Sequence, residues 1–445
     1  MLNNRVFIIN RSELEGRFDP IFYASDLAKF NTNIFKSVLL KSIVKYFKSG
    51  FGAGKQEQTD AENGIIQIRP TNIDENGFLK YDKNIYLPID KNSIRIEVDD
   101  ILFNNTNSQE LVGKTAILKE NKELTFSNHI TIIRVRKEAI LPDYLWIILN
   151  MYQRNRIFYS ICTNWNNQSG IGLELLKKLK IPLPPLEIQQ QIVDLYEKAY
   201  TEKQQKEAEA QRLLDSIDDY LLGELGITLP KEEELLPQNT DKNNSYNLDN
   251  DNPLVKKGRL FLTNLSEVTG KRWNAFEFKN RKLKLGDGNY PNKTLKHLAY
   301  LLKGQSITSN ELEKGDYPVI AGGQISPYTH NRYNFTGNVI TISASGAYSG
   351  YVWYHNYPIF ASDCTVVFSK EESEITTLYL SEILKLKQKE IYNLQQGAGQ
   401  PHVYARDLEK INIPIPSLQK QKDITNEITT IREEAKQLQI EAINT

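Results

Sequence analysis

The chain has 445 residues, of which 40% are hydrophobic and 25% are charged, and its formal net charge is zero. This length exceeds what one hydrophobic core normally serves, so we expect two or more domains of globular composition. The neutral charge argues against a strongly basic nucleic-acid binder. No apolar run reaches the length of a membrane-spanning helix, and the first residues, MLNNRVFIIN, do not resemble a signal peptide.

The charges are unevenly distributed along the chain. Residues 186–258 contain 16 acidic and 8 basic side chains, a net charge of −8, so the remainder carries +8. A moderate basic excess outside the acidic segment is compatible with contact to DNA. The two cysteines, Cys162 and Cys364, and the five histidines show no metal-ligand spacing. We therefore expect reduced thiols, no metal site and a cytosolic protein.

Residues 1–184 predict a first domain of mixed α and β structure. Apolar residues alternate or cluster, as in strands, at 65–68, 101–103 and 129–135, and Gly, Asn and Asp residues between them favour turns. A helix is expected to follow Pro142.

The stretch 178–192, KLKIPLPPLEIQQQI, ends this domain. Proline moves the residue before it out of the helical region, so residues 181–184 must be extended, and Pro185 can then open a helix. Apolar spacing predicts one long helix over residues 185–225. Residues 226–258 are polar and predict a linker.

Residues 259–416 predict a second domain of the same kind, with strands at 339–342, 351–354 and 365–368. The C-terminal helix, residues 417–445, has apolar residues spaced 4, 3, 4, 3 and 4 apart from Ile424 onward. This period of about 3.5 is typical of a coiled-coil seam, so we expect the two long helices to pair. The residues expected at this pairing or partner-docking surface are Ile188, Ile192, Leu195, Leu213, Ile217, Ile424, Ile428, Ile431 and Leu438.

The two halves resemble each other. The stretch 410–424, KINIPIPSLQKQKDI, aligns without a gap on 178–192, and residues 259–274 resemble residues 5–19 near the start of the first half. The aligned pairs are Pro182 and Pro414, Pro184 and Pro416, Leu186 and Leu418, Gln189 and Gln421, Ile192 and Ile424, and upstream Gln168 and Gln400, Ile171 and Val403, Leu176 and Leu408. Matched landmarks in one order predict a tandem duplication. The expected fold class is α+β, with two tandem homologous domains, each followed by a long helix.

The sequence offers no catalytic centre. Neither Asn-Pro-Pro-Tyr nor Asp-Pro-Pro-Tyr occurs, and a base-flipping amino-methyltransferase would need such a loop. The stretch 49–56, SGFGAGKQ, lacks the first glycine and the Ser or Thr of a phosphate-binding loop. The triplet 120–122 resembles part of a nuclease site, but such triplets arise by chance in a charged chain. We predict a chain that is not itself an enzyme and binds no cofactor.

The loops are instead rich in Asn, Gln, Ser, Thr, Arg and Tyr, which contact base edges and phosphates. Each of these residues alone is more often a solvated turn residue or a backbone cap, and only their clustering favours nucleic-acid contact. The candidate DNA-binding residues are Lys55, Gln56, Arg69, Asn104, Asn105, Asn107, Ser108 and Lys114 in the first half, and Gln305, Gln324, Tyr328, His330, Arg332, Ser345 and Tyr348 in the second.

Several motifs resemble those of one family, the DNA-specificity subunits of type I restriction–modification systems. In the first half these are RFDP at 17–20, IRPTNI at 68–73, and DILFNNTNS at 100–108 followed by LVGK at 111–114. In the second half they are GDYPVI at 315–320 and GQPHV at 399–403, together with both proline-rich junctions. At Asn105 the family usually has arginine.

The resemblance implies two target-recognition domains, each contacting one part of a split, asymmetric sequence in double-stranded DNA. It implies that the helices pair antiparallel, fix the spacer between the two parts and dock two methyltransferase subunits, which bind S-adenosylmethionine. A restriction and translocase subunit, which binds ATP and Mg²⁺, can join this cytoplasmic assembly.

Three alternatives stay open at this point. A specificity subunit of another phage-defence methylation system would have the same sequence features. A scaffold of two adhesive domains on a coiled coil, without a DNA function, would have the same architecture. A self-contained nuclease or methyltransferase is disfavoured by the missing motifs.

Overall fold

The computed structural model describes residues 34–88, 94–166, 168–228, 288–397 and 399–445. It divides into two compact units, Met1–Thr201 and Glu202–Thr445. The matched starts of the two halves, and the predicted linker from residue 229 onward, lie outside the described residues. No helix in the described ranges is long and apolar enough to cross a membrane.

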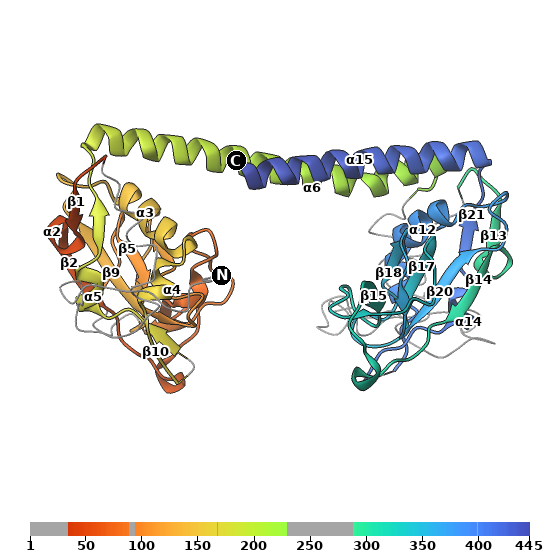
Figure 1. Ribbon diagram of the computed structural model, residues 1–445, viewed down its shortest axis with the longest axis horizontal. Helices are drawn as coiled ribbons and strands as arrows, with labels where there is room; N and C mark the ends of the chain where they lie inside the picture. The colour runs from red at the N-terminus through yellow and green to blue at the C-terminus, as the bar shows by residue number, and fades with distance from the viewer. Residues whose placement is uncertain (1–33, 89–93, 167, 229–287, 398) are drawn as a thin grey trace, which may run out of the picture. The chain divides into compact units, whose positions relative to one another are not determined.

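The first unit is built on a four-stranded antiparallel sheet in the order β2-β9-β5-β7 (Figure 1). A three-stranded sheet, β4-β3-β8, contains a parallel pair, and two smaller sheets are β1-β12 and β10-β11-β6. The strands are β1 (Ser37–Leu39), β2 (Val44–Ser49), β3 (Gly64–Ile68), β4 (Tyr86–Pro88), β5 (Ile101–Asn104), β6 (Thr106–Asn107), β7 (Thr115–Ile117), β8 (Leu124–Phe126), β9 (Ile130–Val135), β10 (Thr163–Trp165), β11 (Gln168–Gly170) and β12 (Lys180–Pro182). The helices are α2 (Leu40–Ile43), η3 (Lys55–Glu57), η4 (Pro70–Asn72), α3 (Pro142–Arg154), α4 (Ile157–Ile161), α5 (Leu173–Lys177) and α6 (Leu186–Leu225), which continues into the second unit.

Strand β5 is buried along its whole length because both of its faces are covered. Ile101 and Phe103 belong to a core shared with α3, whereas Leu102 belongs to a second core shared with β3 and β8. Helix α3 begins with Pro142 in its first turn, where the missing N–H costs no hydrogen bond. The first unit is therefore layered, with α3 on one face of the main sheet and the β4-β3-β8 sheet on the other.

The second unit repeats this topology. Its sheets β14-β20-β17-β18, β16-β15-β19 and β13-β21 match β2-β9-β5-β7, β4-β3-β8 and β1-β12, including the parallel pair. The elements are β13 (Asn292–Thr294), α11 (Leu295–Leu298), β14 (Ala299–Lys303), η6 (Ser309–Glu311), β15 (Tyr317–Ile320), β16 (Thr329–His330), β17 (Val339–Ser343), β18 (Val352–His355), β19 (Phe360–Ala361), β20 (Cys364–Ser369), α12 (Thr377–Leu386), α13 (Gln388–Tyr392), α14 (Ala405–Leu408), β21 (Asn412–Pro414) and α15 (Leu418–Asn444). The predicted duplication is thus confirmed in strand order and pairing. The strands predicted from apolar patterning are also confirmed, as β3, β5 and β9 and as β17, β18 and β20.

A buried glutamine fixes the start of each long helix. Gln189 and Gln421 are both fully buried. The Gln189 side-chain oxygen accepts a hydrogen bond from the Leu141 N–H at 2.8 Å, and the Gln421 oxygen accepts one from the Thr376 N–H at 2.9 Å. Each side-chain amide also donates to the carbonyl of the proline five residues earlier, at 2.8 and 3.0 Å. The start of each long helix is therefore tied to the start of the helix beside it, α3 or α12.

A tyrosine adds a second tie at the same place. The hydroxyls of Tyr144 on α3 and Tyr379 on α12 donate to the carbonyls of Pro182 and Pro414, both at 3.0 Å. These bonds hold the proline-rich strand against its helix. The strand is extended, as the proline pattern predicted.

The long helices pair within the second unit. Lys206, midway along α6, lies 3.6 Å from Glu441 near the end of α15. Lys420, in the first turn of α15, forms an ion pair with Glu224 near the end of α6. This pattern shows that α6 and α15 run antiparallel. Ile217 of α6 and Ile424 and Ile428 of α15 are buried in one core, and Ile431 packs against it. Leu213 and Leu438 are half-buried.

The first part of α6 packs on its own domain instead. Val193 is buried in the core of the first unit, Ile192 and Tyr196 pack against that core, and Ile188 is half-buried. Leu195 is 69% exposed. Leu195 therefore lies outside the seam between the helices, because the inward position of Gln189 sets which face of α6 meets the domain, and its expected place at a partner-docking surface stays a prediction.

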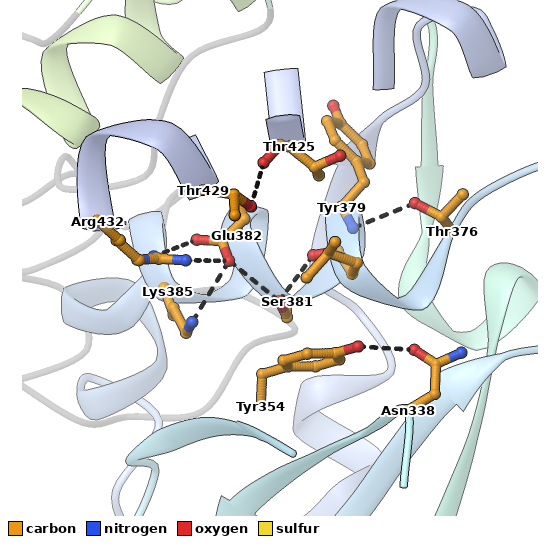
Figure 2. Close-up of polar contacts among 11 residues, drawn as sticks. Asn338, Tyr354, Thr376, Tyr379, Ser381, Glu382, Lys385, Thr425, Thr429 and Arg432 are labelled. Carbon is orange, nitrogen blue, oxygen red and sulfur yellow. Dashed lines mark hydrogen bonds and ion pairs between the residues drawn. The ribbon is translucent and has the colours of Figure 1, made fainter. Parts of the chain in front are cut away.

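A charged network joins α12 to α15 (Figure 2). The Arg432 guanidinium donates two hydrogen bonds, of 2.7 and 2.6 Å, to the carboxylate of Glu382, which is 1% exposed. The Lys385 ammonium lies 3.4 Å from the same carboxylate. Burial alone would raise the pKa of Glu382, but the bonds from Arg432 and the charges of Lys385 and Arg432 outweigh it and hold this pKa below its usual value.

We predict that Arg432→Leu destabilises the protein by about 3–5 kcal/mol, because it leaves the Glu382 carboxylate buried without its main partner. The double variant Glu382→Gln/Arg432→Leu should recover part of this loss, because no buried charge is left unpaired. The matched control is Arg212→Leu, which removes an ion pair with Glu209 on the surface of α6. Urea unfolding should show no change for the control, and an equal loss for both arginine variants would contradict this assignment.

Glu382→Gln should also change the pH dependence of stability. Because the folded pKa of Glu382 is lowered, its contribution is fully present above the unfolded value of about 4.3 and is lost as pH falls through the folded pKa. The stability difference between the wild type and Glu382→Gln should therefore shrink below about pH 4. A difference that is constant from pH 7 to pH 3 would show that the carboxylate charge is not what stabilises the network.

Candidate nucleic-acid interface

Several segments of the first unit gather at one end of its strands. Strands β2 and β5 of the main sheet and strands β3 and β8 of the second sheet end there, and β9 begins there, since Ser49 faces Thr131 and Asn104 faces Ile130. The loops that follow these strand ends are residues 50–56, 67–69, 104–108 and 127–129, joined by the hairpin of β10 and β11. We call these segments the first loop cluster.

Hydrogen bonds hold the first loop cluster together. The N–H groups of Gly50 and Asn105 donate to the carbonyls of Ile130 and His129, at 3.2 and 3.0 Å. The Asn105 side-chain amide donates to the Thr131 hydroxyl at 2.9 Å. The loops are therefore fixed on the sheet, as a surface that binds a rigid ligand requires.

Five of the predicted residues lie on or beside this surface. Lys55 and Gln56 are exposed on η3. Asn107 and Ser108 are half-buried on and after β6. Arg69 is half-buried, and its guanidinium donates to a loop carbonyl, that of Ala53, at 3.3 Å.

Two predicted residues bond to backbone carbonyls within the domain, although Lys114, unlike Asn104, is only half-buried. Asn104 is fully buried, and its amide donates to the Leu111 carbonyl at 3.3 Å. The Lys114 ammonium donates to the Ile73 carbonyl, and burial lowers the pKa of this lysine. This placement gives both residues a structural role within the first unit in place of the predicted DNA contact. The Asn105 side chain is likewise occupied by its bonds between loops.

The second unit forms an equivalent set of loops, residues 304–306, 321–328, 344–351, 362–363, 395–397 and 399–402, which we call the second loop cluster. The N–H of Gly304 donates to the Cys364 carbonyl at 2.9 Å, and the N–H of Ala344 donates to the Asp363 carbonyl at 3.1 Å. These bonds repeat those of Gly50 and Asn105 in the first unit. Both domains thus present loops on the same backbone frame.

The second loop cluster brings five predicted residues together. Gln305, Gln324, Tyr328 and Tyr348 are exposed, and Ser345 is half-buried. The Gln324 side chain hydrogen-bonds the Tyr392 hydroxyl. The Ser345 hydroxyl donates to the Asp363 carboxylate.

His330 and Arg332 lie apart from that cluster. His330 pairs with Tyr317 at the far end of the β15–β16 hairpin, is 6% exposed and packs edge-on against Phe360. Arg332 follows it in sequence and is exposed. These two residues are not brought to the strand-end loops.

The sequence reasoning missed two residues of the loop clusters. Trp165, 47% exposed, lies on β10, and Asp363 lies between β19 and β20. Carboxylates are few at the described segments: Asp363 lies in the second loop cluster, and Glu57 lies beside the first, on the same short helix as Lys55 and Gln56. Surfaces this poor in negative charge suit a polyanionic ligand.

The described ranges contain no cluster of side chains suited to a metal ion. No group of three or more His, Cys, Asp or Glu side chains in those ranges is arranged to hold a metal ion. Both cysteines are buried, and burial raises the pKa of the Cys364 thiol to about 12, which keeps it protonated.

Comparison with known proteins identifies the family. The model of the type I restriction modification DNA specificity domain matches residues 27–212 and 287–445. These two tandem matches cover more than half of the chain, which therefore belongs to this family.

Individual relatives agree with this assignment. The putative type I restriction enzyme MjaX specificity subunit of Methanocaldococcus jannaschii is 26% identical over 348 residues, 76% of this chain and 72% of that protein. The putative type I specificity subunit S.MpnORF285P of Mycoplasma pneumoniae is 26% identical over 153 residues, 32% of this chain and 49% of that protein. A chain in a solved structure on complex assembly and conformational transition of the type I R-M system has the same fold, with a TM-score of 0.53 at 15% identity over 92% of this chain and 93% of that one.

We predict that the close approach of Gly50 to the sheet holds the first loop cluster in place. A Cβ at Gly50 would lie 2.3 Å from the Phe126 carbonyl oxygen, whereas a Cβ at Gly52 would lie 3.7 Å from its nearest neighbour, on Asn128. Gly50→Ala should therefore cost about 1–3 kcal/mol of unfolding free energy, and the matched control Gly52→Ala should cost less than about 0.5 kcal/mol. Urea unfolding measures both, and equal stability of the two variants would contradict the prediction.

Proposed function

We propose that the chain is the DNA-specificity subunit of a type I restriction–modification complex, with each half contacting one part of a split, asymmetric DNA sequence. The observation that supports this most directly is the pair of loop clusters on one duplicated frame. The backbone bonds of Gly50 and Asn105 recur at Gly304 and Ala344, while the exposed side chains differ. Equal frames with unlike side chains suit two half-sites of unlike sequence.

The subunit itself is proposed to be non-catalytic. Most residues at both loop clusters are amides, hydroxyls and aromatic rings, which bind base edges and backbone, and a few charged groups such as Lys55, Arg69 and Asp363 lie among them. S-adenosylmethionine, ATP and Mg²⁺ would be bound by partner subunits, and the complex would act on DNA in the cytoplasm.

Two methyltransferase subunits are the proposed partners of the long helices, with restriction and translocase subunits joining them. Leu186 and Leu195, 39% and 69% exposed, lie on the part of α6 that does not pair with α15. They are the exposed large hydrophobic residues of α6, and a partner that docks on this part of the helix would bury them. Leu195 is therefore proposed as a docking residue, which is one of the two roles expected from the sequence.

Exchange of one domain tests the division of labour. Residues 259–416 would be replaced by the same region of a relative, and methylated bases would be mapped in a host that expresses the chain with its methyltransferase. Only one half of the methylated motif should change. A change in both halves would show that the domains do not read separate half-sites.

The proposed spacer function can be tested at Thr201. Tyr200 packs against Phe78 in the first unit with its ring tilted, and Lys206 meets Glu441 of α15, so an insertion at Thr201 leaves both contacts intact. Seven added residues form about two turns and lengthen the helix by about 10 Å, close to three base pairs. The spacer of the methylated motif should become about three base pairs longer than that of the wild type.

The control for this experiment is a five-residue insertion at the same site. It lengthens the helix by about 7.5 Å and rotates the two helix segments by about 140° relative to each other, so its methylated motif should differ from that of the seven-residue variant. An unchanged spacer in the seven-residue variant would show that α6 does not set the distance.

A further inference from the structure

A hairpin at the end of the first loop cluster carries an aromatic residue that the second domain lacks. Strand β10 pairs with β11, and β11 pairs with β6, which carries Asn107. In the second unit the aligned stretch pairs in the same order, through antiparallel bridges from His402 to Gln396 and to Ser345. The residue aligned with Trp165 there is Gly397, so the aromatic side chain is specific to the first domain.

Trp165 stands exposed on this hairpin. All three residues of β10 are exposed, and the indole retains 47% of its accessible surface. A large aromatic side chain left this open loses much of the free energy that its burial would provide. An open ring face of this kind can pack against a ligand.

The hairpin holds the indole in one place. A Cβ at Gly170 would lie 2.4 Å from the Trp165 ring, so the ring rests directly on the opposite strand. The Asn164 side-chain oxygen accepts hydrogen bonds from Ser169, at 2.6 Å, and from Cys162, at 3.4 Å. The Ile171 N–H donates to the Asn105 carbonyl at 2.9 Å, which ties the hairpin to the neighbouring loop.

The surroundings of Trp165 suit DNA better than a protein partner. Residues 144–173 contain no Asp or Glu, and two arginines of this stretch are exposed, Arg154 at the end of α3 and Arg156 in the turn before α4. Asn166 and Gln168 next to the ring are exposed amides, not apolar groups. Amides that bond base edges, cations for phosphates and one rigid aromatic ring are the groups that proteins use on nucleic acids. These residues do not form an apolar rim such as a protein-docking patch has.

We propose that Trp165 is a DNA-contacting residue specific to the first domain, whose indole packs against the sugars and bases of the first half-site. Asn166 and Gln168 place their amides at the adjacent base edges. Within the first unit, β10 lies at the end opposite the start of α6, beside the strand-end loops (Figure 1). This inference rests on the proposed function and adds one contact that the second half-site does not receive.

The test uses the full chain in complex with its methyltransferase and a labelled duplex that carries the motif mapped for the wild type. Trp165→Ala should weaken binding about tenfold, and Trp165→Phe should retain most of it, because an aromatic face remains. The salt dependence of binding should not change, because no cation is removed. Tyr300→Ala is the matched control, since Tyr300 is 48% exposed but lies on β14, outside the second loop cluster, and this variant should bind as the wild type does.

Failure of the proposed function and failure of the DNA contact by Trp165 give different results. If the wild-type complex does not retain its mapped duplex over random DNA, the proposed function fails. If the wild type binds and a folded Trp165→Ala, checked by circular dichroism, binds within twofold of it, the inference about Trp165 is overturned. Loss of the methyltransferase from Trp165→Ala without DNA, seen by size-exclusion chromatography, would overturn it in favour of a protein contact.

Discussion

The buried glutamine at the start of each long helix is the interaction on which the architecture depends. Gln189 and Gln421 satisfy backbone groups at the start of the neighbouring helix and in the proline-rich strand, and they are fully enclosed. An enclosed amide that lost these partners would cost about 1–3 kcal/mol, so few other helix orientations are tolerated. The direction of each long helix is therefore determined by its own domain, and within the first unit the strand-end loops lie at the other end of the sheet (Figure 1).

Duplication explains how one frame can serve two specificities. Backbone bonds are repeated between the domains, while side chains at equivalent places diverge, as with His129 and Asp363 next to the start of β9 and β20. The contacts that hold each long helix against its domain also differ. In the first unit Tyr200 packs on Phe78, and in the second the aligned Arg432 binds Glu382. Either the ring contact or the ion pair holds the long helix against its domain. The exposed loops can therefore vary in sequence while the sheets and helices keep their positions.

The periodic parts of the structure could be predicted from the sequence, because apolar spacing reports directly on burial. The strands at 101–103 and 339–342 and the seam at Ile424 and Ile428 are of this kind. Apolar spacing could not decide whether Leu195 lies in the seam or on the exposed face of α6, since an inward glutamine sets the face of that helix turn and its hydrogen-bond partners are distant in sequence. Asn104 and Lys114 look like surface polar residues, and only tertiary contacts reveal that they support loops from within.

The central claim is that the two halves are equivalent modules that each read their own half-site on a common frame. A chain in which residues 5–201 are replaced by residues 259–433 would carry two copies of the second domain, joined at aligned positions of the long helices. Since those helices pair antiparallel, base-resolution methylation mapping with the cognate methyltransferase should reveal an inverted repeat of the second half-site. Methylation of the original asymmetric motif by this chain would contradict the account.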